Sequence, residues 1–132
     1  MKGFNSDIEK LTLENDKFRK VLYTGKHMQL VLMSLKVGED IGAEAHPNID
    51  QFFRLEAGSG KCVIDENEYN VNAGDVIIIP AGAKHNVINT DPALELKMYT
   101  IYAPPNHLDG TIRVTKEDAE AKPEEFDGKT SE

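Results

Sequence analysis

Residues 74–89 read Gly74-Asp-Val-Ile-Ile-Ile-Pro80-Ala-Gly82-Ala-Lys-His85-Asn-Val-Ile-Asn89. The β-branched run ends at a proline, and the Pro-x-Gly group predicts a sharp turn, so the pattern favours two short strands over a buried helix. Because the run 76–79 shows no polar alternation, we expect its strand to be covered on both faces. In the second strand His85 shares a face with Val87, which aims its imidazole toward an apolar interior.

A second stretch, residues 38–58, reads Gly38-Glu-Asp-Ile-Gly-Ala-Glu44-Ala-His46-Pro-Asn-Ile-Asp-Gln51-Phe-Phe-Arg-Leu-Glu-Ala-Gly58. Glu44 and His46 are two residues apart, so both point to one face of a strand. If the turn after His46 resets the alternation, Gln51 shares the apolar face of Phe53. Unpaired polar side chains facing an apolar interior each cost several kcal/mol, and one bound cation would satisfy all three.

The rest of the chain has short apolar runs separated by turn residues, without a sustained helical period, which predicts an all-β barrel or sandwich. Strands are expected at residues 18–23, 28–36, 43–46, 50–56, 61–65, 68–72, 76–79, 85–90 and 94–102. We treat residues 1–132 as one domain. Residues 1–16 are expected to form an N-terminal arm in which 7–15 are a short helix or extended. Residues 116–122 predict a short surface helix capped by Thr115, and residues 123–132 predict a flexible tail.

Composition narrows the range of partners. The chain carries 15 basic and 23 acidic residues and a net charge of -8, which disfavours nucleic-acid and anionic-membrane binding. A single cysteine, Cys62, excludes an internal disulfide and fits a reducing compartment. No apolar run is long enough to cross a bilayer. We therefore expect a cytoplasmic protein without a nucleic-acid or membrane partner.

Together the two stretches resemble the two-part signature of the cupin superfamily, in the form found in small single-domain bacterial cupins. The second half is complete, with matches at Gly74, Pro80, Gly82, His85 and Asn89. The first half matches at Gly38, His46 and Gly58. It departs at Glu44, where the signature has its first histidine, and at Gln51, where it has its glutamate. The signature spans residues 38–89.

This resemblance implies a small antiparallel β-barrel, or jelly roll, that holds one divalent transition metal. By position, the ligands would be Glu44, His46, Gln51 and His85. Glu44 replaces a neutral histidine and Gln51 replaces a charged glutamate, so the set keeps one carboxylate. Two imidazoles with two oxygen ligands suit Fe, Mn, Ni or Zn without selecting among them. Two histidines with one carboxylate are also similar to the ligands of non-haem iron oxygenases.

The resemblance further implies a small polar molecule as ligand or substrate, and a dioxygenase-type or sugar or sugar-acid isomerase-type reaction. A non-catalytic barrel that binds or senses a small molecule is the alternative, and a structural barrel with a vestigial site is a third reading. Phe53, Met98 and His107 are candidate substrate contacts. Because small cupins pair through edge strands, we expect a homodimer.

Overall fold

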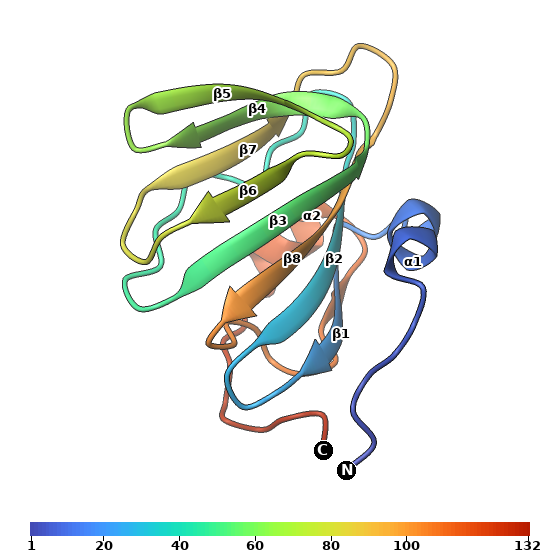
Figure 1. Cartoon of the computed structure of the whole chain (residues 1–132), viewed down its shortest axis with the longest axis vertical. Helices are drawn as coiled ribbons and strands as arrows, with labels where there is room; N and C mark the ends of the chain where they lie inside the picture. The colour runs from blue at the N-terminus through green and yellow to red at the C-terminus, as the bar shows by residue number, and fades with distance from the viewer.

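The computed structural model describes residues 1–132, which form two antiparallel β-sheets packed against each other (Figure 1). The strands are β1 (Arg19–Thr24), β2 (Gln29–Leu35), β3 (Asp50–Ala57), β4 (Ser59–Ile64), β5 (Asn67–Asn72), β6 (Val76–Ile79), β7 (His85–Asn89), β8 (Leu96–Ala103) and β9 (Ile112–Arg113). The larger sheet has the order β6-β3-β8-β2-β1-β9, and the smaller has the order β5-β4-β7. The expected all-β jelly roll is confirmed.

The hydrophobic core lies between the two sheets, because alternate residues of each strand point inward. Strand β8 has the clearest alternation: Leu96, Met98, Thr100 and Tyr102 are buried, and the residues between them are partly exposed. Phe53 of β3 and Val87 of β7 contribute to the same cluster from opposite sheets. Each such side chain stabilises the fold by about 1.5–3 kcal/mol through burial, so the alternation in the sequence fixes which face of each strand is interior.

The loop between β2 and β3 lies beside β7 rather than forming a strand of its own. The strand expected at residues 43–46 is absent: among these residues only Glu44 pairs with β7, through an isolated bridge to His85. Two backbone hydrogen bonds form this bridge, Glu44 N to His85 O at 3.0 Å and His85 N to Glu44 O at 2.8 Å. Gly42, with φ of 91°, bends the chain just before the bridge, and Pro47 follows it, so the pairing at Glu44 stays a single bridge. A second isolated bridge to β7, from Asp40 to Ile88, lies on the other side of the bend.

Strand β6 is exposed on its outer face, contrary to the sequence expectation for residues 76–79. Val76 is 50% exposed and Ile78 is 65% exposed, while Ile77 and Ile79 are buried. The physical reason is that only the inward face of a strand meets the core between two packed sheets, and helix α1 (Ile8–Glu14) contacts β8, β3 and β2 on the outer side of the larger sheet, whose edge strand is β6. The two-residue strand β9, which pairs with β1, was not expected from the sequence.

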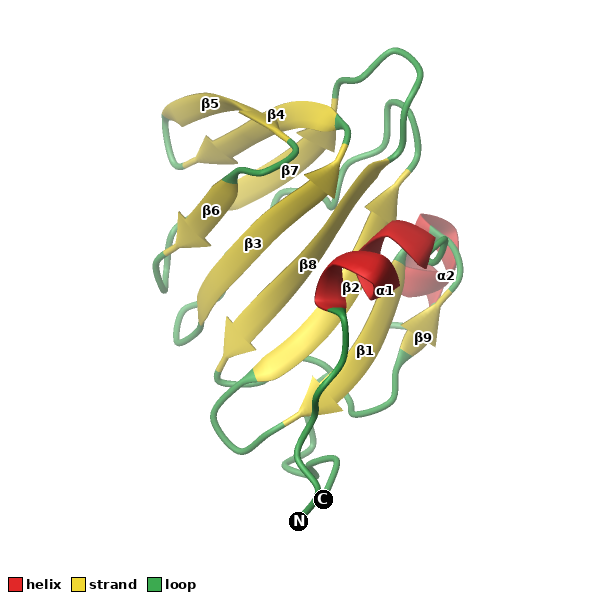
Figure 2. Ribbon diagram, turned by 45° about the vertical axis from the view of Figure 1, so that its right-hand side comes forward, coloured by secondary structure: helices red, strands yellow, loops and turns green.

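Two short helices flank the sheets. Helix α1 is capped by Asp7, whose side chain accepts a hydrogen bond from Lys10 N, and lies across the outer face of the larger sheet (Figure 2). It realises the helical alternative for the N-terminal arm. The predicted C-terminal helix is present as α2 (Lys116–Ala121), and the Thr115 side chain caps it by accepting from Asp118 N at 3.0 Å. Neither helix is long and apolar enough to cross a membrane.

The chain termini lie side by side (Figures 1 and 2). Gly3 N donates to Glu132 Oε2 at 3.0 Å, and Ser131 N donates to Thr24 O at 2.9 Å. Residues 123–132 therefore run back along the barrel, and their expected flexibility stays a prediction. This path brings Glu124 into the interior next to β1 and β9.

Candidate metal centre

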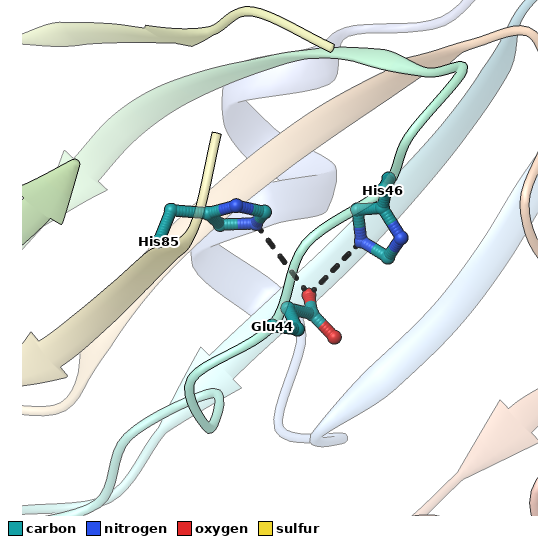
Figure 3. Close-up of side chains that lie close together, drawn as sticks. All are labelled: Glu44, His46 and His85. Carbon is teal, nitrogen blue, oxygen red and sulfur yellow. Dashed lines mark ion pairs between the residues drawn. The ribbon is translucent and has the colours of Figure 1, made fainter. Parts of the chain in front are cut away.

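Glu44, His46 and His85 come together where the β2–β3 loop meets the start of β7 (Figure 3). The bridge between Glu44 and His85 places these two side chains beside each other, and His46 follows two residues later on the same loop. Glu44 Oε1 lies 3.3 Å from His46 Nε2 and 3.7 Å from His85 Nε2. The two imidazole rings are 5.5 Å apart between centroids. One carboxylate oxygen thus faces both Nε2 atoms.

The imidazoles of this cluster favour the charged form of Glu44, and Glu44 favours that of His85. Burial raises the pKa of Glu44, but the nearby imidazoles of His46 and His85 more than offset it and lower that pKa to about 2. For His85, burial lowers the pKa, and the Glu44 carboxylate together with the Ala83 carbonyl outweigh that effect and raise it. Glu44 is therefore an ionised carboxylate at neutral pH.

Three buried polar atoms at this end of the barrel have no hydrogen-bond partner: Nε2 of His46, Nε2 of His85 and Oε1 of Gln51. His85 Nδ1 lies 3.1 Å from the Ala83 carbonyl, which can only accept, so Nδ1 carries a proton and Nε2 is the nitrogen that faces Glu44 and is available to a metal in the neutral ring. A metal-binding histidine has this arrangement of its two ring nitrogens.

Gln51 is only 1% exposed and points inward from β3. Its Nε2 donates to Thr100 Oγ1 at 3.0 Å, which leaves Oε1 as the unpaired acceptor. Leaving such an acceptor buried and unpaired costs about 1–3 kcal/mol, so the position calls for a further partner. The sequence placed Gln51 on the interior face, and the structure agrees with that orientation.

The residues present fit a divalent metal ion. Two bonds of about 2.1 Å that enclose about 90° to 120° put their donor atoms about 3.0–3.6 Å apart, close to the separations around Glu44 Oε1. Two neutral imidazole nitrogens and a carboxylate oxygen suit Fe, Mn, Ni or Zn. The side chain of Glu44 is 36% exposed, so the cluster is reached from solvent on the carboxylate side. The ligand set itself stays a prediction.

The other candidate residues lie at different depths. Phe53 and Met98 are fully buried in the core cluster, and their contact with a ligand stays a prediction. His107 is buried beside Tyr102, with ring centroids 5.0 Å apart, and Tyr102 packs edge-on to His46 at 5.9 Å. Sequence reasoning missed Tyr102, because an aromatic residue in an alternating strand looks like ordinary core.

Comparison with known proteins gives consistent relatives. Residues 31–102 match the family model described as cupin domain. The uncharacterised protein YrkC of Bacillus subtilis (strain 168) is 49% identical over 126 residues, covering 91% of this chain and 67% of that protein. An uncharacterised protein of Acanthamoeba polyphaga mimivirus is 42% identical over 113 residues, covering 83% of this chain and 71% of that protein. The crystal structure of BH2720 from Bacillus halodurans superposes with a TM-score of 0.89 at 45% identity, covering 92% of this chain and 96% of that one.

Proposed function

This chain belongs to the cupin domain family, and on that premise we propose that it is a metal-dependent enzyme acting on a small polar molecule. The carrying observation is the convergence of an ionised carboxylate with two buried imidazole Nε2 atoms that have no hydrogen-bond partner. Barrels of one fold host many chemistries, so the proposal rests on this cluster and not on the fold.

His46 and His85 would hold the ion through their Nε2 atoms, and Glu44 through Oε1. Gln51 would complete the set through its unpaired Oε1, which keeps one negative charge among the ligands. A bound divalent ion would polarise a substrate oxygen as a Lewis acid or, if it were iron, support reaction with oxygen. The chain thereby fits two reaction classes, dioxygenase-type and sugar or sugar-acid isomerase-type.

Glu44 has a second proposed role because it is the most exposed member of the cluster. A substrate arriving from solvent meets this carboxylate first. Where a substrate oxygen takes its place, Oε1 is free to accept a proton from the substrate. His46 and His85, which are more deeply buried, have no such freedom and serve as fixed ligands.

Metal content of untagged protein purified without chelator tests the proposal. We expect close to one equivalent of Fe, Mn, Ni or Zn in the wild type and in His27→Ala, which changes an exposed histidine. His85→Ala should lose the metal. Equal metal in His85→Ala and wild type, or no metal in any of the three, would contradict the ligand assignment.

A substrate screen with and without oxygen follows for the loaded protein. Turnover that is lost in His46→Ala supports the enzyme, and oxygen dependence separates the dioxygenase-type from the isomerase-type reaction. Tight binding of a small molecule without any turnover would contradict the proposed catalysis and support a binding or sensing barrel.

A further inference from the structure

A chain of buried polar contacts connects the C-terminal segment to the candidate metal centre. It begins at Glu124, whose side chain is only 8% exposed although it follows Pro123 in a segment of tail-like composition. Glu124 Oε1 lies 2.6 Å from His107 Nδ1, and its other oxygen lies 3.4 Å from Arg113. Arg19 is 4.0 Å away on β1. A buried carboxylate persists only with such partners, so this one is built into the interior.

Each hydrogen bond among these buried side chains has a defined donor and acceptor. Burial raises the pKa of Glu124, but His107 and the two arginines outweigh that effect and lower it, so the carboxylate is ionised and can only accept. His107 Nδ1 therefore carries the ring proton and donates to it. His107 Nε2 is left as the acceptor, and two donors face it: the Tyr102 hydroxyl at 3.1 Å and Asn106 Nδ2 at 3.5 Å.

The backbone around His107 is held equally firmly. Gln29, fully buried on β2, accepts from His107 N at 2.9 Å and from Asn106 N at 3.2 Å, and its Nε2 donates to His107 O at 2.7 Å. A buried side chain with all of its hydrogen-bonding groups paired rigidifies the loop that it binds. These contacts hold His107 in the position from which its imidazole contacts Tyr102.

Tyr102 connects His107 to the predicted ligands. Its ring packs edge-on to His46, at 5.9 Å and 81°, and its Cα pairs with that of Gln51 across β8 and β3. The second predicted imidazole, His85, is oriented by a backbone carbonyl at Nδ1. The ring of His46 has Glu44 Oε1 at 3.3 Å from its Nε2 and packs against two other rings, those of His85 and Tyr102. The position of Tyr102 therefore helps to set the orientation of the His46 ring.

We propose that Tyr102, His107 and Glu124 form a positioning network, through which the C-terminal segment sets the orientation of the His46 ring at the metal centre. The proposal rests on the proposed function, since it assigns these residues a role toward the same site. All three are positioning residues: they act on the metal through His46. The C-terminal segment is then a working part of the site rather than a tail.

Binding of Co²⁺ tests the network, measured by competition with a chelator together with the visible absorption spectrum. The variants are Tyr102→Phe, which keeps the ring and removes the hydroxyl, and Glu124→Gln, which keeps the shape and removes the charge. Glu125→Gln is the matched control, because Glu125 is exposed. Partners that orient a metal ligand change affinity by about 10- to 100-fold when altered. We expect each variant to bind Co²⁺ about tenfold more weakly with a changed spectrum, and the control to match wild type.

The double variant separates a connected network from two unrelated contacts. If the three residues act as a unit, Tyr102→Phe with Glu124→Gln loses no more affinity than the weaker-binding single variant. Losses that multiply would overturn the network, as would single variants that bind within twofold of wild type with an unchanged spectrum. Thermal melts of the metal-free variants check that each is folded.

Imidazole NMR signals of the metal-free protein give a readout that needs no metal. We expect Tyr102→Phe and Glu124→Gln to shift or broaden the His46 ring signals, and Glu125→Gln to leave them unchanged. Wild type that binds no Co²⁺ while the His46 signals respond would overturn the metal role alone. Normal Co²⁺ binding in all variants with unchanged His46 signals would overturn the positioning network alone.

Discussion

Gln51→Glu restores the residue type that the cupin signature has at this position, at nearly constant volume. In the metal-free protein we expect it to destabilise the fold. Gln51 is 1% exposed and its Oε1 already lacks a partner, at a cost of about 1–3 kcal/mol. An unpaired buried carboxylate costs about 3–5 kcal/mol, so the substitution removes about 2 kcal/mol from the free energy of unfolding. The negative charge of Glu44 opposes ionisation of the new carboxyl further.

Metal should reverse the sign of this effect. A carboxylate ligand in place of an amide adds a negative charge toward the ion, which we expect to strengthen binding about tenfold. Metal at 100 times its dissociation constant stabilises the folded state by about 2.7 kcal/mol, and a tenfold tighter site gains about 1.4 kcal/mol more at the same concentration. The variant should therefore gain more stability from metal than wild type does.

Urea unfolding with and without Co²⁺ measures both effects. The result expected is a lower free energy of unfolding for Gln51→Glu in chelator, and a larger increase on adding metal than in wild type. A variant that is destabilised equally with and without metal would show that residue 51 lies outside the coordination sphere. A metal-free variant as stable as wild type would refute the reasoning that Oε1 is buried and unpaired.

Three further predictions test the fold and its charges. The pKa of Glu124 is lowered from its ordinary 4.5, so its ionised form stabilises the fold above that pH, and this stabilisation is lost as the pH falls through the folded-state pKa. Between pH 5 and pH 3, urea unfolding should show a larger decrease in the free energy of unfolding for wild type than for Glu124→Gln. Equal decreases would contradict the buried ion pairs. Gly60→Ala should cost about 1–3 kcal/mol or more because its Cβ would lie 2.4 Å from the Ile88 carbonyl oxygen, whereas Gly25→Ala, whose nearest contact is 3.4 Å, should cost less; equal thermal melts would refute the close approach. Sedimentation at micromolar concentration should give a dimer that Ile78→Lys converts to monomer, because the β6 edge is apolar and exposed, and a monomeric wild type would end this expectation.

The sequence by itself determined most of the strands and, where polar and apolar residues alternate, the interior face of the strand. Alternation in residues 94–98 anticipated β8, and the turn at Pro80 and Gly82 anticipated the start of β7 at His85. These features are local: a side-chain period of two and a proline or glycine at a turn act within a few residues. The same locality let the sequence place Gln51 on the interior face. The spacing of Glu44 and His46 likewise anticipated that they face the same cluster.

Only the tertiary structure decided which buried groups become neighbours. Glu44 meets His85 through one isolated bridge because Gly42 bends the loop against β7, a contact that no periodic pattern encodes. Strand order likewise put 76–79 at an edge, and hydrophobicity alone does not distinguish an edge from a centre.

Glu124 gives the clearest case. Seventeen residues separate it from His107 and many more from the loop that carries His46, and its local sequence is that of a solvated tail. Its burial depends on two arginines and an imidazole that converge on it from β1, β9 and the segment after β8. A charge is stable in a protein interior only when its partners surround it, and here those partners are brought together only by the tertiary fold.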